Sequence, residues 1–264
     1  MFLAIFAICR SEAQAKYPDI PYMDSTMAAY LQQINFWSSY INGMSEPPDT
    51  LVHTNNRLME YLKMVAADPH TIYTSFPLAE GKGLMSITSS DGKLRVYAWD
   101  TWTGGSMHYF NSLAQYNAVA NVNVKVLNDV NSNSKSADPG AYYTEMNTIA
   151  KADGKTAYLI TDCTIASKTN KANGIHAYEI DGNDLKKTML FKTRKHISDF
   201  IDFVYDVSYD SINAIIVSIH FSPDKRKLYI PVVLKNGRLA NEYWVYVFKG
   251  DKYVYKKRVK GLQI

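Results

Sequence analysis

A change of hydrophobic period at Pro77 limits the folds open to this chain. Before Pro77, apolar residues recur at every third or fourth position, which places them on one face of a helix. After Pro77, apolar and polar residues alternate, as they do in strands. The sequence therefore predicts a short helical N-terminus followed by a body built of β-strands.

Two helices are expected before Pro77, joined into a helical hairpin by Glu46-Pro47-Pro48-Asp49. Asp24 or Ser25 is the expected start of the first helix and Asn42-Gly43 its end, and Asp68-Pro69 ends the second helix. We expect this hairpin to pack on the sheet, because its first apolar stripe is long and contains Trp37. The stripe comprises Met23, Met27, Tyr30, Leu31, Ile34, Trp37 and Ile41.

The alternating segments group into three units, each roughly strand, turn, strand, loop, strand, turn and strand. The units align on Asp91-Gly92-Lys93, Asp153-Gly154-Lys155 and Asp224-Lys225-Arg226, at spacings of 62 and 71 residues. The predicted fold is mainly β, with antiparallel meander sheets in about three four-stranded units and a short N-terminal helical hairpin. A propeller-like fold is the alternative, but propeller repeats span about 40 to 50 residues and at least four blades are needed to close a ring. A short helix is expected between the second and third units, over His196 to Asp202.

The N-terminus has the apolar run and the cleavage site of a secretory signal peptide. The run is Phe2 to Cys9, and Ala13-Gln14-Ala15 is the cleavage signal. We therefore divide the chain into a signal peptide over 1–15 and a single domain over 16–264, with a helical part over 16–75 and a β-rich body over 76–264. The expected location is periplasmic or extracellular, and no transmembrane segment is expected in the mature chain.

The formal net charge of +4, with acids and bases intermixed, is too small to predict a nucleic-acid partner. The main basic cluster lies on the last alternating strand. We interpret it as a lysine-rich edge strand that resists aggregation, with a patch for an anionic partner as the alternative. The cluster consists of Lys252, Lys256, Lys257, Arg258 and Lys260.

No motif specifies a cofactor or a metal: the chain has no HExxH, no GxxxxGK[ST] and no GxGxxG. Residues 104–108 begin like a nucleophile elbow, but His108 stands where that turn needs a small residue. Residues 129–140 begin like a calcium loop but lack its glycine and its final glutamate. Cys163 and His176 fall on neighbouring strands, and a small buried thiol is preferred there over a nucleophile pair.

The best candidate surface is the hairpin end around residues 97–108, where two tryptophans, an acid and a histidine come close in sequence. Aromatic rings stack on sugars and apolar ligands, while aspartate and histidine supply directional hydrogen bonds. The alternative is that Trp99 belongs to the core and Trp102 covers the sheet edge. The predicted ligand-binding residues are Tyr97, Trp99, Asp100, Trp102 and His108.

The run Arg95 to Asp100 with Thr103-Gly104-Gly105, after a secretory start and two helices, resembles a group of uncharacterised exported proteins from Bacteroidetes. The resemblance spans most of the chain after residue 15. It implies a periplasmic or envelope location and transfers no activity and no catalytic residue.

The function we expect is that of a non-catalytic envelope protein that binds a ligand or partner, with a glycan or an envelope protein as candidates. The alternative is a hydrolase acting on glycan or peptide, whose residues are scattered over the sheet. Acids on separate strands, such as Asp100 and Asp162, would then meet in space. A structural subunit of an envelope assembly is the third possibility.

Overall fold

The structure, a computed structural model, describes residues 19–40, 48–119, 121–130, 138–209 and 218–261. The predicted signal peptide, the Asn42-Gly43 helix end and much of the polar loop 129–140 lie outside the described residues. The alternating segment Ile212 to Phe221 also predicts a strand, and most of it lies outside the described residues.

The predicted helical hairpin is confirmed as α1 (Ile20–Ser38) and α2 (Asp49–Ala67), but the expected start at Asp24 or Ser25 is wrong, because α1 begins at Ile20. The helix α2 ends before Asp68-Pro69, because proline disfavours a helical residue before it. Two short turns, η1 (Pro69–Tyr73) and α3 (Pro77–Glu80), extend the helical part five residues past the predicted boundary at 75. Within the described residues, no helix has both the length and the apolar character needed to cross a bilayer.

The prediction of a mainly β fold is confirmed, and the strands form three sheets, here called A, B and C. The strand order is β1-β2-β3-β4 in sheet A, β11-β7-β6-β5 in sheet B and β10-β9-β15-β14-β13-β12 in sheet C. In sheet B the short β8 also pairs with β7. The strands are β1 (Met85–Thr88), β2 (Leu94–Asp100), β3 (Phe110–Asn117), β4 (Val122–Asn128), β5 (Tyr142–Ala150), β6 (Thr156–Ile165), β7 (Asn170–Asp181), β8 (Asp184–Lys187), β9 (Phe191–Lys192), β10 (Ile197–Ser198), β11 (Phe200–Asp206), β12 (His220–Phe221), β13 (Lys227–Val233), β14 (Leu239–Phe248) and β15 (Tyr253–Lys260).

Each predicted unit supplies most of one sheet, but the segment between the second and third units was misread. The helix expected over His196 to Asp202 is wrong, because those residues form β10 and the start of β11. The chain passes from sheet B to sheet C at β9, returns to sheet B at β11 and enters sheet C again at β12. The sequence pattern also predicts a strand over Ser106 to Tyr116, but β3 begins only at Phe110.

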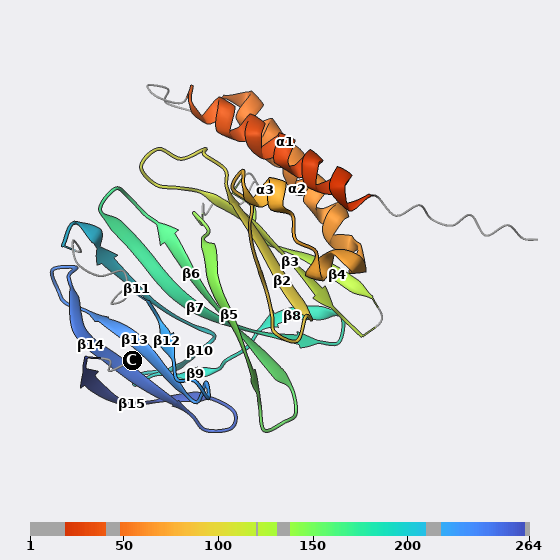
Figure 1. Cartoon of the computed structure of the whole chain (residues 1–264). Helices are drawn as coiled ribbons and strands as arrows, with labels where there is room; N and C mark the ends of the chain where they lie inside the picture. The colour runs from red at the N-terminus through yellow and green to blue at the C-terminus, as the bar shows by residue number, and fades with distance from the viewer. Residues whose placement is uncertain (1–18, 41–47, 120, 131–137, 210–217, 262–264) are drawn as a thin grey trace, which may run out of the picture.

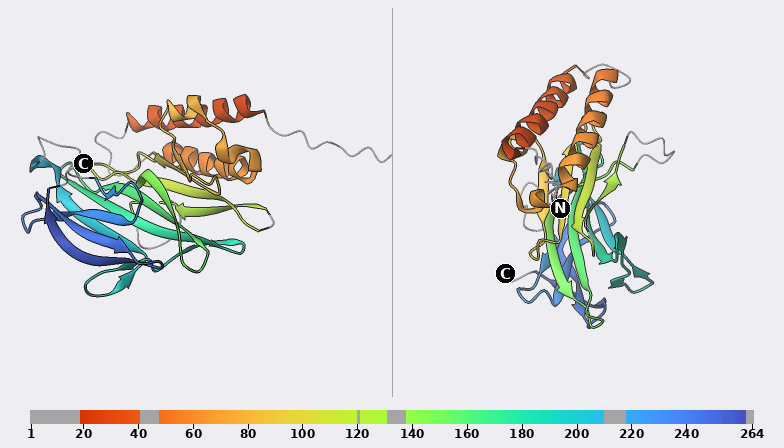
Figure 2. Two further views of the ribbon diagram at one scale, coloured as in Figure 1. Left: turned by 60° about the horizontal axis from the view of Figure 1, so that its bottom comes forward. Right: turned by 90° about the vertical axis from the view of Figure 1, so that its right-hand side faces the viewer.

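Alternation along the strands explains how the layers stack. Odd-numbered residues of β2 and β3, such as Trp99 and Leu113, join the helices in one core, which includes the α1 stripe from Met23 to Trp37. Even-numbered residues of β2 and β3 pack against Tyr158 and Ile160 of sheet B in a second core. The opposite face of sheet B joins sheet C in a third core. The helices thus cover sheet A, and sheet B lies between sheets A and C (Figures 1 and 2). This stack differs from the closed ring of a propeller.

The aligned turns use one local device. In each, a side-chain oxygen accepts a hydrogen bond from the backbone N–H two residues later, which stabilises the turn without help from the rest of the fold. Gly92 has φ 64° and its hydrogen faces Tyr73, so a Cβ there would collide with the Tyr73 ring. Lys225 takes the same left-handed conformation in the third unit, at φ 56°. The acceptors and donors are Asp91 with Lys93, Asp153 with Lys155, and Asp224 with Arg226. A further turn outside the alignment, at Asn236 and Arg238, makes the same hydrogen bond.

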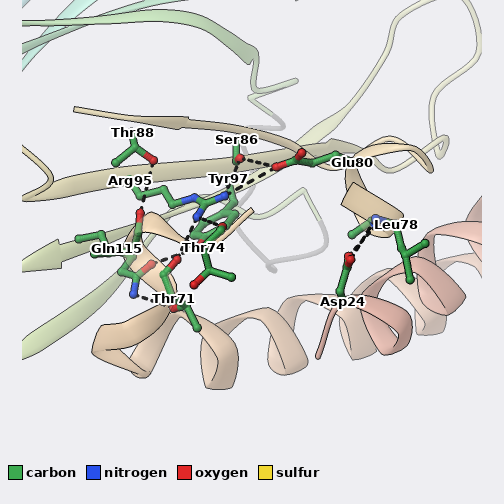
Figure 3. A network of polar contacts seen from close by, with 12 residues as sticks. Asp24, Thr71, Thr74, Leu78, Glu80, Ser86, Thr88, Arg95, Tyr97 and Gln115 are labelled. Carbon is green, nitrogen blue, oxygen red and sulfur yellow. Dashed lines mark hydrogen bonds and ion pairs between the residues drawn. The ribbon is translucent and has the colours of Figure 1, made fainter. Parts of the chain in front are cut away.

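Buried polar side chains fix the helical part to sheet A (Figure 3). The Arg95 guanidinium is almost fully buried and donates to the Thr71 carbonyl at 2.9 Å and to Ser86 Oγ at 2.8 Å. It also lies 4.7 Å from the centroid of the Tyr97 ring. On α1, the Asp24 carboxylate accepts hydrogen bonds from the first backbone N–H groups of α3, at 2.9 and 3.0 Å. These contacts couple both helices and the segment 69–80 to the strands.

Candidate functional site

The Asp100 carboxylate organises the loop between β2 and β3. Its Oδ1 accepts a hydrogen bond from the Trp102 backbone N–H at 2.8 Å. Its Oδ2 is in hydrogen-bond contact with His108 Nδ1. The Asp100 side chain, at the end of β2, therefore fixes both the backbone at Trp102 and the orientation of the His108 ring. Trp102 and His108 thus converge over Asp100.

Trp102 combines an exposed ring with an unusual backbone. Its φ is 55°, in the left-handed region that a residue with a Cβ rarely occupies. The side chain is 39% exposed, and its ring centroid lies 5.3 Å from that of His108. Such strain persists only where the surroundings impose it, and it is concentrated at ligand-binding sites. Here the hydrogen bond to Asp100 helps to impose it.

A buried asparagine on α2 supports the loop from beneath. Asn55 is fully buried, and its Oδ1 accepts a hydrogen bond from Trp99 Nε1 at 2.9 Å. Its Nδ2 donates to the Thr101 carbonyl at 2.9 Å. The loop is fixed on its other side by the His108 backbone N–H, which donates to the Ile165 carbonyl of β6. The base of the site is thus held by a helix and by sheet B.

Two of the five predicted ligand-binding residues do not reach the surface. Tyr97 and Trp99 are both 0% exposed, so the prediction that they contact a ligand is corrected: both belong to the core under the helices. Tyr97 donates its hydroxyl hydrogen to Gln115 Oε1 at 3.0 Å, and burial raises its pKa to about 12. Both side chains point to the helix-covered face because they alternate with residues that face sheet B.

Asp100, Trp102 and His108 line a cavity of about 490 Å³ between α1, the turn that follows α3 and the β2–β3 loop. Most of its remaining wall is apolar, from Leu31, Met85, Phe110, Tyr142 and Ile165, and Lys82 adds a cation at its edge. A mostly apolar cavity with a few convergent polar groups is typical of a small-molecule site. Leu31, Met85, Tyr142 and Ile165 were not predicted, because α1, β1, β5 and β6 reach this loop only in the folded chain.

A second set of polar side chains lies on the face of sheet B that is turned toward sheet A. Asp162 Oδ2 is 3.0 Å from His176 Nε2, and the His176 ring stacks on Phe200, with centroids 5.6 Å apart. Asp162, Gly174 and Asp202 are paired in register across β6, β7 and β11. A Cβ on Gly174 would lie 2.7 Å from Asp162 Oδ1, so this close approach requires glycine. A cavity of about 230 Å³ includes these residues.

The two pairings considered from the sequence do not form. Cys163 is in register with Asn173, whereas His176 is in register with Ile160, so thiol and imidazole point to opposite faces of sheet B. Burial also raises the pKa of the Cys163 thiol, which disfavours the reactive thiolate. Asp100 and Asp162 line different cavities. Across the described residues, no three His, Cys, Asp or Glu side chains are grouped so as to hold a metal ion.

Comparisons with known proteins add little to this geometry. No protein-family model matches the chain, and none of the curated proteins matches it. Among solved structures, it has a distant likeness to a "putative 6-phosphogluconolactonase" from Bacteroides uniformis, with 10% identity over 67% of this chain and 84% of that chain. The TM-score is 0.13, so this likeness supports no conclusion about fold or function.

Proposed function

We propose that this chain is an exported, non-catalytic binding protein of the cell envelope, and that it binds a glycan at the Asp100–Trp102–His108 site. The supporting observation is that Asp100 holds Trp102 in a strained backbone conformation with its ring exposed beside a cavity. A core tryptophan needs no such arrangement. The same carboxylate also orients His108, which places a polar group next to the aromatic ring.

A sugar ring matches this combination of groups. The C–H face of a pyranose stacks on an indole ring, and its hydroxyls take hydrogen bonds from charged or polar side chains at the ring edge. Asp100, His108 and Lys82 lie along the wall and supply acceptors and donors. The apolar part of the wall excludes water from the stacked face, which strengthens those hydrogen bonds.

The test is a binding screen by thermal shift and calorimetry with soluble oligosaccharides and peptidoglycan fragments. A ligand at a hundred times its Kd adds about 2.7 kcal/mol to stability, which raises the Tm by several degrees. Trp102→Ala should abolish that shift. Tyr22→Ala is the matched control, because Tyr22 is exposed on α1 and lies outside the site. Equal ligand binding by Trp102→Ala and the parent would refute the site.

Export is supported by the apolar run Phe2 to Cys9 and the cleavage signal Ala13-Gln14-Ala15. The test is to express the full chain in a Gram-negative host, fractionate the cells and sequence the N-terminus of the product. A periplasmic product that begins near Lys16 supports the proposal. An uncleaved cytoplasmic product would contradict it.

A hydrolase at the Asp162 cavity is the second candidate. Asp162 and Asp202 flank Gly174 in register, so their Cα atoms are separated by two inter-strand spacings, about 10 Å. Carboxyl groups about 6.5–9.5 Å apart act as acid and base in inverting glycosidases. The test is hydrolysis of chromogenic glycosides by the parent, by Asp162→Asn and by Asp202→Asn. Turnover lost in both variants supports this candidate, and absence of turnover by the parent rules against it.

A further inference from the structure

Two basic segments far apart in sequence meet at one side of sheet C. The strand β9 pairs in parallel with β15, with Phe191 beside Tyr253 and Lys192 beside Val254 (Figure 1). After Lys192 the chain turns, with the Thr193 N–H donating to the His196 carbonyl, and returns as β10. This turn lies beside β15, because Arg194 Cζ is 4.5 Å from the centroid of the Tyr255 ring.

The cations of the two segments are exposed and mostly unpaired. Within the described residues, the only ion pair that these cations form is that of Arg258 with Glu242 on β14. These seven positive charges exceed the formal net charge of +4 for the whole chain, so the remaining residues are net negative. The set, here called the basic strip, is Lys192, Arg194, Lys195, Lys256, Lys257, Arg258 and Lys260.

Two arginines of the basic strip are positioned by aromatic rings. Arg194 Cζ is 5.2 Å and Arg258 Cζ 5.4 Å from the centroid of the Trp244 ring. A guanidinium stacked on a ring is restrained, so it loses less freedom when its N–H groups bind an anion. Since both arginines contact the Trp244 ring, this ring is a poor platform for stacking a nucleobase. The basic strip therefore recognises charge rather than bases.

We propose that the basic strip binds a polyanionic polysaccharide, one that bears sulfate, phosphate or carboxylate groups along its length. A group of seven cations from two segments matches a polymer with repeated charges better than it matches a single small anion. The proposal does not depend on the glycan site at Trp102, which lies on sheet A. It also extends the interpretation of β15: its lysines follow the short pairing with β9 and do not only protect an edge.

The test is titration of fluorescent heparin at 50 and 200 mM salt. If all seven cations contact the polymer, and each contributes about 0.7 to the salt slope, affinity falls roughly 10³-fold between these concentrations. Each of two double variants, Arg194→Ala with Lys195→Ala and Lys256→Ala with Lys257→Ala, should bind more weakly and lose only about 10²-fold. The control Lys93→Ala with Lys168→Ala removes two exposed lysines from other sheets and should behave like the parent.

Each outcome of the titration either supports or overturns the proposal. Weaker binding with a smaller salt slope in both double variants, with Tm values equal to that of the parent, supports the basic strip. Absence of heparin binding at 50 mM salt overturns the proposal, as does unchanged affinity in either double variant. Binding of duplex DNA, or of phosphatidylglycerol vesicles, as tight as that of heparin overturns the assignment to a polysaccharide.

Discussion

Replacing Asn55 by alanine should destabilise the protein far more than replacing a polar residue on a helix normally does. Asn55 is fully buried and is the hydrogen-bond partner of Trp99 Nε1 and of the Thr101 carbonyl, both also fully buried. In Asn55→Ala, these two groups lose their partners in a place that water does not reach. An unsatisfied buried polar group costs about 1–3 kcal/mol, so the pair costs roughly 2–6 kcal/mol. The better helix propensity of alanine recovers at most about 0.7 kcal/mol.

The measurement is urea denaturation followed by far-UV circular dichroism, with thermal melting in parallel. At about 2–4 °C per kcal/mol for a chain of this size, the central estimate of about 4 kcal/mol lowers the Tm by roughly 8–16 °C. Asn56→Ala is the matched control, since Asn56 is the next residue of α2 and is exposed. It should change stability by less than about 0.5 kcal/mol. Equal midpoints for the two variants would show that the Asn55 hydrogen bonds do not support the loop.

Three further predictions test other parts of the fold. Gly174→Ala should destabilise the protein by about 1–3 kcal/mol in urea denaturation, because its Cβ would press on the Asp162 carboxylate, whereas Gly105→Ala, which meets nothing within 4 Å, should be nearly neutral. Burial pushes the pKa of Glu179 up, but hydrogen bonds from two lysines outweigh this effect and lower the pKa. Stability should therefore fall as the pH drops below about 4.5. Glu179→Gln should flatten the acidic part of a plot of Tm against pH. In a chain whose other cysteine is replaced by serine, Cys163 should react with a thiol reagent at pH 8 only upon unfolding, and rapid reaction of the native protein would contradict its burial.

The regular elements were predictable because each carries its own local signal. The stripe on α1 and the turns at Asp91 and Asp153 depend on residues a few positions apart, so the sequence exposes them directly. The segment His196 to Asp202 was misread because β10 has only two residues, and the strand character of β10 and β11 depends on pairing with β9 and β7. Such pairing partners are set by tertiary structure, which a local pattern does not contain.

The candidate site was predictable only in part for the same reason. Asp100, Trp102 and His108 fall within nine residues, and the loop brings them together. Tyr97 and Trp99 have equally suitable side chains, but the alternation of β2 turns both toward α2 and buries them. Which face of a strand a helix covers is decided by the packing of distant segments.

The interleaving of sheets B and C has a consequence for synthesis of the chain. The helices and sheet A are complete once Asn128 has left the ribosome, while sheet B lacks β11 until Asp206 has emerged. At about 5–20 residues per second, this interval lasts roughly 4–16 s. For most of it, the even-numbered apolar residues of β2 and β3, among them Val96 and Tyr116, are not yet covered by all the sheet B residues that bury them, the last of which is Leu185. A nascent chain with such a face is a substrate for chaperones.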